Sequence, residues 1–318
     1  MPTEALRPKD LLPDALITSW AVKAGTGPAF NINQIAPVVP VARPDFKHAV
    51  YANDELNDEV QTLVAAGDRP ASVRRYAPTF APATADRHAL DDFISDEVAK
   101  QAPNGMYLEQ RRTQKLVANL QLGIAKRVMA KYQAAGTVGS APSTKWGAAS
   151  GTTIEKNLDD AREALLPLCG YEATHVIIPA GVARVMKRST ELRALRQYTD
   201  PSLLINGDLP SVLFGLNVMV PGALHNAGTA KADESQTIAR IWNDDTVYVL
   251  YLDPNVGDVE TFQPVIQARW SEWGAPFAGY TWRDPHLSVK GRWLSVEVYQ
   301  GEVTIASSAV YRIPDVIS

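Results

Sequence analysis

A long amphipathic helix, expected over residues 106–133 (MYLEQRRTQKLVANLQLGIAKRVMAKYQ), most constrains what this chain can fold into. Its apolar residues recur three or four positions apart, which places them on one helical face. They are Leu116, Val117, Leu120, Ile124 and Val128. At 1.5 Å per residue the helix is about 40 Å long, and its internal Gly123 costs about 1 kcal/mol relative to alanine. The segments before it look like extended arms, and those after it look like compact mixed α and β structure.

The composition indicates a folded protein that is no dedicated nucleic-acid binder. The chain has 318 residues, of which 46% are hydrophobic and 21% charged, as in ordinary globular proteins. A net charge of -4 argues against a basic nucleic-acid-binding patch, although not against a protein that encloses nucleic acid. No apolar run approaches the roughly 18–20 residues that span a bilayer. The N-terminus (MPTEALRPKDLLPDAL) carries charges and prolines where a signal peptide has an apolar core, so we expect a soluble protein made in the cytoplasm.

The first 88 residues are expected to form two extensions from a compact body. Residues 1–45 combine short apolar clusters with many prolines, and prolines exclude an apolar segment from a central strand. This pattern predicts an extended N-terminal arm that lies along another surface. Residues 46–88 contain strand-like pieces at 46–52 and 72–80 around an acidic stretch, which predicts a long hairpin. An isolated hairpin is marginally stable in water, so it should also rest on another surface.

The remaining segments predict an α+β domain. Helices are expected at 89–101, 153–168, 180–187, 191–197 and 209–214, with Pro167 ending or distorting the second. Strands are expected at 174–178, 216–220, 238–242, 246–252, 259–270, 293–299 and 302–313. Turn-forming residues at 243–245 and 300–301 should join neighbouring strands into hairpins.

The sequence contains no recognised catalytic or nucleotide-binding motif. The single cysteine, Cys169, ends an apolar helical run, which favours a buried structural thiol over a nucleophile. His175 lies in a strand pattern typical of a core histidine. Residues 253–258 resemble a calcium loop in composition but lack the bidentate glutamate, so a turn is favoured. We therefore predict no catalytic residue, no cofactor and no metal site.

An aromatic cluster close to the C-terminal third of the chain admits two interpretations. It comprises Trp270, Trp273, Phe277, Tyr280 and Trp282. Such residues can line a ligand pocket, but more often they form core or a subunit interface, and we favour the second interpretation.

Charged residues of the hairpin region and of the long helix are the candidate functional residues, as contacts between subunits. Those of the hairpin region are Asp54, Glu55, Asp58, Glu59, Arg69, Arg74, Arg75 and Arg87. On the helix, Arg112, Lys115 and Lys126 share one side, away from the apolar stripe. They either face solvent or contact acidic groups of a neighbouring subunit or an enclosed polyanion, and both interpretations stay open.

The order of these elements resembles the major capsid proteins of tailed bacteriophages, which have the Hong Kong 97-type fold. RRYAPTFAPATADRHALDDFISDEVAKQAPNGMYLEQRRTQKL resembles the passage from E-loop to spine helix in one branch of that family. VIIPAGVARVMKRSTELRALR, LPSVLFGLNVMVPGA and ARIWNDDTVYVLYL resemble parts of its axial domain. The resemblance implies an N-terminal arm (1–45), an E-loop (46–88), a peripheral domain (89–172) with spine helix 106–133, an axial domain (173–258) and peripheral return strands (259–318).

The resemblance also implies a function. The chain would be a structural protein and not an enzyme, forming pentamers and hexamers of an icosahedral shell around double-stranded phage DNA without sequence-specific binding. It would belong to the virion, be assembled in the host cytoplasm and have no membrane association. The implied partners are a portal, a decoration protein in some relatives, and a separate scaffolding protein, because the arm is short and unlike a coiled coil. Two alternatives are an encapsulin-type nanocompartment shell and an α/β enzyme with an aromatic pocket.

Overall fold

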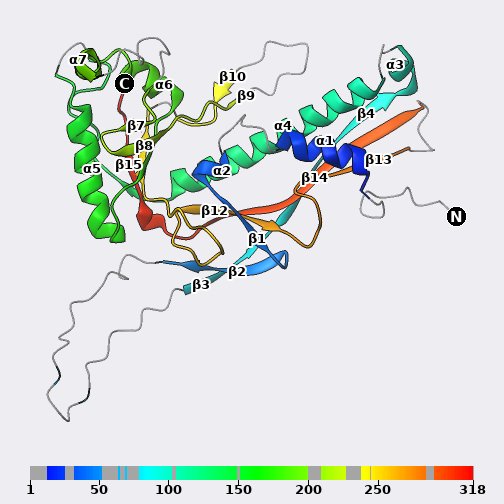
Figure 1. Cartoon of the computed structure of the whole chain (residues 1–318), viewed down its shortest axis with the longest axis horizontal. Helices are drawn as coiled ribbons and strands as arrows, with labels where there is room; N and C mark the ends of the chain where they lie inside the picture. The colour runs from blue at the N-terminus through cyan, green and yellow to red at the C-terminus, as the bar shows by residue number, and fades with distance from the viewer. Residues whose placement is uncertain are drawn as a thin grey trace.

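The computed structural model describes residues 13–25, 32–51, 64, 69, 79–101, 105–148, 151–199, 209–226, 238–243, 245–283 and 290–317. One long helix, α4 (Gly105–Ala134), crosses the molecule and connects two β-sheets (Figure 1). Its 30 residues confirm the helix expected at 106–133. Within the described residues, no helix combines the length and apolarity of a membrane span.

The apolar stripe of α4 is shared between the two sheets. All five residues of the stripe are buried. Leu116, Val117 and Leu120 pack with Leu294, Val296 and other residues of the first sheet. Further along the helix, Ile124 and Val128 pack in a different cluster with residues of the second sheet. The stripe therefore packs on the subunit's own sheets, and the helix supports both of them.

The first sheet is built around one long strand, β14 (Gly291–Thr304). On one side it pairs with β4 (Asp86–Ser95) over ten residues, and on the other with β13 (Ala278–Trp282) and then β12 (Val265–Trp270). Beyond β12 lies β1 (Val38–Val41), parallel to it at the sheet edge. Pro40 lies in this edge strand, where a missing N–H costs no ladder bond, as expected for an apolar, proline-rich segment.

The second sheet has six strands, and its faces bury alternate residues. Its order is β5 (Thr137–Val138), β15 (Val310–Ile313), β11 (Val247–Leu250), β6 (His175–Ile177), β8 (Leu216–Met219) and β7 (Val212–Leu213). In β11, Val247 and Val249 join the core under α5 (Ile154–Cys169) and α6 (Ala180–Met186), while Tyr248 and Leu250 join the core under α4. Helix α7 (Thr190–Thr199) follows α6 (Figure 1).

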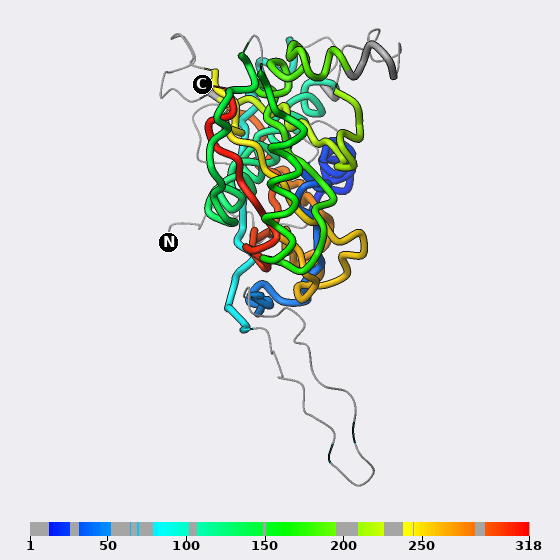
Figure 2. The backbone as a smooth tube through the Cα atoms, turned by 90° about the vertical axis from the view of Figure 1, so that its left-hand side faces the viewer, coloured from blue at the N-terminus to red at the C-terminus, as the bar shows by residue number. Residues whose placement is uncertain are grey.

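Two small ribbons lie outside these sheets. Strands β2 (Asp45–Val50) and β3 (Thr79–Thr84) form an antiparallel pair at the lower end of the molecule (Figures 1 and 2). They form the base of the expected hairpin, of which residues 52–63, 65–68 and 70–78 lie outside the described part. Strands β9 (Leu224–Asn226) and β10 (Ile238–Arg240) form the second ribbon. The short elements are α2 (Ile32–Ile35), α3 (Asp96–Gln101) and the 3-10 turn Ser307–Ala309.

Part of the expected extended arm is a helix docked on the body. Helix α1 (Ala15–Gly25) buries Ile17 and Ala21 against α4 and β13. Asp14 caps the N-terminus of this helix, because its carboxylate accepts hydrogen bonds from the N–H groups of Leu16 (2.9 Å) and Ile17 (3.2 Å). The prolines of the arm therefore do not keep this stretch extended, because it finds its apolar surface on its own subunit.

Long-range pairing overrides local helical pattern at two positions. The helix expected at 89–101 is wrong over most of its length, because residues 86–95 pair along β14 and only Asp96–Gln101 is helical. The helix expected at 209–214 is also wrong. Residues 212–219 form the β7–β8 hairpin, whose turn has Phe214 at φ 49 and Gly215 at φ 79. Two successive residues with positive φ match a type I′ turn.

Two expected hairpins are also wrong. Strand β10 pairs with β9 and β11 pairs with β6 and β15, so residues 243–245 do not join a hairpin. Gln300 and Gly301 lie within β14 and pair with β12. The last strand, β15, lies in the second sheet beside β11 and not among return strands of the first. The helix expected at 153–168 is confirmed as α5, which continues past Pro167 to Cys169 and ends at Gly170 with φ 75.

Gly301 allows Thr84, at the base of the hairpin, to approach β14 closely. A larger residue at position 301 should therefore lower the stability of the subunit. A Cβ at position 301 would meet the carbonyl oxygen of Thr84, where β3 passes into β4. We expect Gly301→Ala to lower the free energy of unfolding by about 1–3 kcal/mol, as overpacking does. Gly222→Ala is the control, because its Cβ meets nothing within 4 Å. Urea unfolding of the unassembled subunit measures both, and equal stability of the two variants would contradict the prediction.

Candidate assembly site

The charged residues expected at subunit contacts fall into three groups. Six of them lie outside the described residues: Asp54, Glu55, Asp58, Glu59, Arg74 and Arg75. Arg69 is exposed, as are Lys115 and Lys126 on α4. Arg87 and Arg112, by contrast, bind carboxylates of the same chain. The structure therefore leaves Arg69, Lys115 and Lys126 as the candidates that form no ion pair with another described residue, while Arg87 is exposed but paired.

Arg87 holds a buried carboxylate on the face of the first sheet opposite α4. Its Nε and Nη2 both lie 2.6 Å from Oε2 of Glu297, whose side chain is only 1% exposed. The other oxygen of Glu297 accepts hydrogen bonds from Tyr280 (2.7 Å) and Trp273 (3.1 Å). Burial and the hydrogen bond with Glu297 raise the pKa of Tyr280 well above its usual range. Arg87 of β4 therefore stabilises the pairing of β4 with β14.

Arg112 ties α4 to the first sheet through an ion pair, although 41% of its side chain is exposed. Its Nη1 lies 3.1 Å from Asp92 of β4. A second pair, Arg292 with Glu109 at 2.8 Å, links β14 to the same part of α4. Within the described residues, Lys115 and Lys126 form no ion pair.

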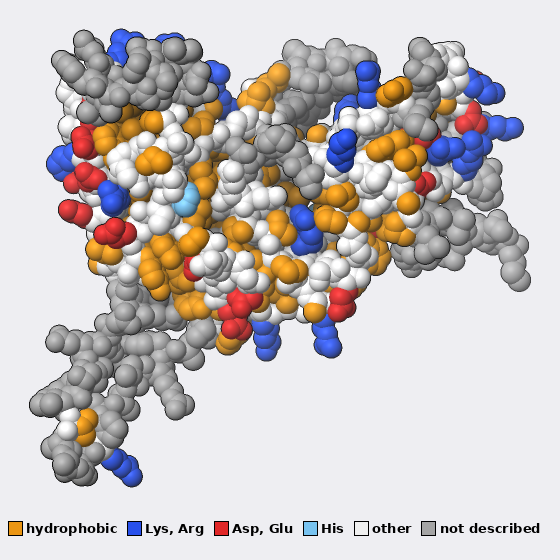
Figure 3. Space-filling model, viewed as in Figure 1, with side chains coloured by type: hydrophobic (Ala, Val, Ile, Leu, Met, Phe, Trp, Pro, Cys, Tyr) orange, Lys and Arg blue, Asp and Glu red, His pale blue; other side chains and the backbone are white. Residues whose placement is uncertain are grey.

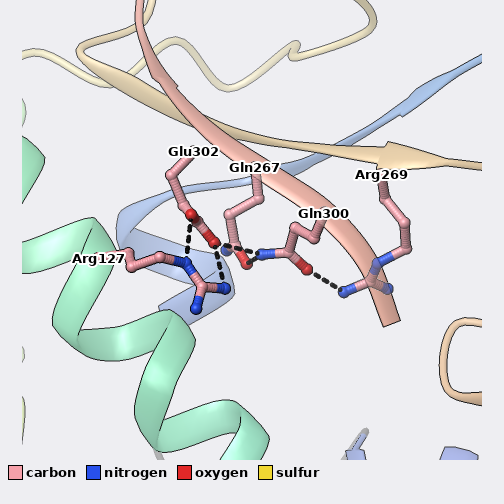
Figure 4. Close-up of polar contacts among 5 residues, drawn as sticks. All are labelled: Arg127, Gln267, Arg269, Gln300 and Glu302. Carbon is pink, nitrogen blue, oxygen red and sulfur yellow. Dashed lines mark hydrogen bonds and ion pairs between the residues drawn. The ribbon is translucent and has the colours of Figure 1, made fainter. Parts of the chain in front are cut away.

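A polar network crosses the interface between α4 and the first sheet (Figure 4). Arg127 of α4 donates to Glu302 through Nε (2.7 Å) and Nη2 (3.1 Å). Gln300 donates to Gln267 (2.7 Å) and accepts from Arg269 (3.0 Å), which extends the network to β12. The side chain of Glu302 is 4% exposed and that of Arg127 33%, so the carboxylate depends on this cation.

Sequence reasoning missed this network, although a signal was present. Gln267 and Arg269 alternate with apolar residues in the strand expected at 259–270, whereas Gln300 falls in the expected turn and Glu302 begins the next expected strand. Polar residues at inward positions of a buried strand require partners. The partner cation lies on α4, more than 130 residues earlier in the chain, and nothing local predicts the pairing.

The other residues singled out from the sequence make contacts typical of residues that stabilise the fold. The thiol of Cys169 is buried beside the Tyr171 carbonyl, and burial raises its pKa, as expected for a structural cysteine. His175 is half-buried next to Thr174 (2.7 Å), and burial lowers its pKa. Asp253 and Asp258 accept backbone N–H groups two residues ahead, which fits a turn. The described residues contain no group of three His, Cys, Asp or Glu side chains that could hold a metal.

The residues of the expected aromatic cluster lie in different parts of the structure. Phe277 is buried in the core beneath α1 and α4. Trp270 and Trp273 pack with Tyr299, and Trp282 stacks on Trp293 with ring centroids 6.1 Å apart. Trp270 and Trp273 therefore belong to one group of rings and Trp282 to another, while Phe277 lies in the core. The interpretation as core or interface fits this arrangement better than the ligand-pocket interpretation.

The surface distributes charge unevenly. In Figure 3 acidic side chains gather at the left edge, over α5, while Lys and Arg side chains gather at the right end.

A family model described as phage capsid protein matches residues 80–302, which is more than half of the chain. The chain belongs to the phage capsid protein family. As a capsid protein it is a structural component of the virion and assembles with copies of itself into a shell.

Solved structures agree with this family in fold. A phage-related protein from Bordetella bronchiseptica RB50 is similar at 16% identity and TM-score 0.69, over 96% of this chain and 98% of that one. A putative capsid protein of a prophage from E. coli CFT073 is similar at 12% identity and TM-score 0.59, over 99% and 100%. The expected α+β Hong Kong 97-type fold of the capsid protein is confirmed. No curated protein matches the chain.

An encapsulin is also similar in fold. The holo-SrpI encapsulin complex from Synechococcus elongatus PCC 7942 matches at 10% identity and TM-score 0.52, over 92% of this chain and 88% of that one. This likeness concerns the fold alone. The match to the phage capsid family therefore favours the capsid protein over the encapsulin alternative.

The buried ion pair predicts a large effect of losing its cation. Arg127→Met leaves Glu302 nearly buried without a charge partner, so we expect unfolding free energy to fall by about 3 kcal/mol, the low end for breaking a buried pair, since Arg127 is partly exposed. Lys126→Met, which removes the exposed neighbouring cation, should change stability by less than about 0.5 kcal/mol. Urea unfolding of the unassembled subunits compares them, and losses of similar size would overturn the role assigned to the pair.

His88 predicts a pH dependence of stability. Burial first, and then nearby Arg127, lower its pKa below the ordinary 6.5. The unfolded chain then binds more protons, so stability is complete above pH 6.5 and falls as pH drops toward the folded pKa. His88→Gln should therefore flatten the fall in unfolding free energy between pH 6.5 and about 5, before carboxylates titrate. Urea titrations across this range measure the slope. An unchanged slope would show that His88 does not contribute.

Proposed function

We propose that this capsid protein forms an icosahedral shell of pentamers and hexamers around double-stranded phage DNA. The observation that carries the proposal is the β2–β3 ribbon, which packs on the body through Phe46 and Ala83 but leaves other apolar surface exposed. Phe80 on β3 is 52% exposed, and the ribbon pairs with neither large sheet. The exposed side of the ribbon would gain stability by burying this apolar surface on a neighbouring subunit.

The contacts proposed between subunits involve charged residues of the hairpin and of helix α4. Residues Asp54, Glu55, Asp58 and Glu59 of the hairpin and residues Arg69, Arg74 and Arg75 carry opposite charges. Lys115 and Lys126 offer cations on α4. Exposed ion pairs contribute little singly, about 0–1 kcal/mol, but a shell repeats each of them in every subunit.

The proposal includes partners and setting. A separate scaffolding protein, a portal and, on the outer surface, a decoration protein would act with the shell in the host cytoplasm. A net charge of -4 suits a wall that confines DNA without gripping phosphates. The protein would act without catalysis, and the subdivision into arm, E-loop, peripheral and axial domains belongs to the same proposal.

Shortening the hairpin tests the assembly role. Replacing residues 52–77 by Asn-Gly should give a folded subunit, because Tyr51 keeps its hydrogen bond to the Ile305 carbonyl (3.0 Å) and Asn-Gly favours a tight turn. We expect this variant to sediment as a small species and to form no shells by electron microscopy, whereas the unaltered chain forms them. Shells of normal size from the variant would contradict the proposed role of the hairpin.

Charge reversal on α4 tests what its exposed face contacts. Lys115→Glu with Lys126→Glu should reduce shell yield, or the DNA content of shells, if these cations bind acidic groups. Reversing both Lys156 on α5 and the exposed Arg184 on α6 gives the same change in net charge away from α4 and is the control. Electron microscopy gives the yield and ultraviolet absorbance ratios give the nucleic-acid content. Unchanged shell yield and unchanged DNA content would show that this face of α4 is exposed to solvent and contacts no acidic group.

A further inference from the structure

Tyr51 lies at the end of the β2–β3 ribbon from which the hairpin continues, and it contacts both halves of the subunit. It directly follows β2 and precedes residues 52–63, which lie outside the described part. Its ring packs on the apolar cluster of the first sheet that contains Val303 and Ile305, and also on the core under α5 and α6. Its N–H donates to the Ile305 carbonyl at 3.0 Å. The direction in which the hairpin starts therefore depends on what holds Tyr51.

A loop at residues 253–263, which runs from the second sheet to the first, holds the hydroxyl of Tyr51. This hydroxyl donates a hydrogen bond to the Glu260 carbonyl at 2.6 Å. The two ends of the loop are joined, because the side chain of Gln263, which is 1% exposed, donates to the Asp253 carbonyl at 2.7 Å. A compact loop whose ends are joined holds its main chain in place, so Glu260 offers Tyr51 a fixed acceptor.

Four aromatic rings continue the contact from Tyr51 to the second sheet. The rings of Tyr51 and Phe262 meet edge to face, with centroids 5.3 Å apart. Phe262 lies 5.4 Å from Tyr171, which stacks on Tyr251 at 4.7 Å. Tyr171 lies in the connection between α5 and β6, and Tyr251 directly follows β11. Aromatic pairs prefer particular geometries, so this chain of rings favours one orientation of the ribbon relative to the second sheet.

The ribbon is attached to the body near both of its ends. At one end Thr84 lies close against Gly301 of β14. At the other end the Ala49 N–H donates to the Val259 carbonyl at 3.3 Å, and the side chain of Tyr51 adds the hydroxyl and ring contacts. A ribbon held at one end alone could swing about that end, whereas the second attachment sets its angle.

We propose that Tyr51 is a positioning residue for assembly, which sets the angle of the hairpin through Glu260 and Phe262. This inference rests on the proposed function of the hairpin. The ribbon and the second sheet of one subunit then move as one body, and a neighbouring copy meets the hairpin at one angle. The rings of Tyr51 and Phe262 are partly exposed, so their contact contributes less to folding than the buried cores do. Losing it should therefore change the angle of the ribbon more than the stability of the subunit.

Distances measured in the unassembled subunit test this position directly. Spin labels are attached at Thr79→Cys, an exposed position at the end of the ribbon, and at Lys156→Cys, an exposed position on α5. Replacing the one natural cysteine, Cys169→Ala, keeps the labels at these two positions. Electron paramagnetic resonance then gives the distribution of distances between the ribbon and the helix that covers the second sheet.

Two variants are compared with the unaltered sequence in this labelled subunit. Tyr51→Phe combined with Phe262→Leu removes the hydroxyl bond and the ring contact, so we expect a broader distribution of distances. Tyr132→Phe is the matched control, because it also loses a hydroxyl bond of 2.6 Å, in this case to the Ile35 carbonyl outside the ribbon and the loop. It should keep the distribution of the unaltered subunit.

Shell yield is the second readout. We expect the combined variant to lower shell yield by about tenfold, which corresponds to about 1.4 kcal/mol. Tyr132→Phe should retain the yield, although urea unfolding should show that it loses at least as much stability, because Tyr132 is fully buried. Circular dichroism confirms folding before either readout is scored. Where the combined variant does not fold, Tyr51→Phe alone, which removes a single hydroxyl, is scored in the same way.

The outcomes separate the possible failures. An unchanged distribution of distances in the combined variant overturns the positioning role of Tyr51. A broader distribution with normal shell yield overturns its role in assembly, and so does an equal loss of yield in Tyr132→Phe, since stability alone would then control assembly. If the distribution broadens but the unaltered chain forms no shells, the proposed function fails while the attachment of the ribbon through Tyr51 stands.

Discussion

The apolar stripe of α4 is the contact on which the whole subunit depends. Leu116, Val117 and Leu120 complete the core of the first sheet, and Ile124, Val128 and Tyr132 complete one core of the second. A single 30-residue helix therefore fixes how the two sheets lie relative to each other. The hydroxyl of Tyr132 also binds the Ile35 carbonyl at 2.6 Å, which fastens the segment before β1 to the same helix.

Buried charge supplies the specificity that an apolar stripe lacks. Apolar faces tolerate sliding, whereas the two bonds from Arg127 to Glu302 form at one register of α4 on β14. On the opposite face of the sheet, Glu297 collects Arg87, Tyr280 and Trp273. β14 thus carries a carboxylate toward each face, and its neighbours are positioned by both. A protein that assembles with copies of itself into a shell benefits from a body that holds one geometry.

The candidate site could be anticipated only in part. Sequence placed Lys115 and Lys126 on the exposed face of the helix, since helical geometry settles which residues share a face. The ion pairs of Arg112 with Asp92 and of Arg87 with Glu297 could not be anticipated, because their partners lie on strands whose pairing the sequence did not predict.

Local periodicity was sufficient for the long helix, its buried stripe and the helix α5, because these depend on neighbours three and four residues apart. The order of elements was sufficient for the family resemblance. Only the tertiary structure decided that residues 86–95 are a strand, that β14 continues through Gly301, and that β15 crosses to the second sheet. Each depends on pairing with a segment distant in the chain, and the free energy of such pairing exceeds the local preference that the sequence alone displays.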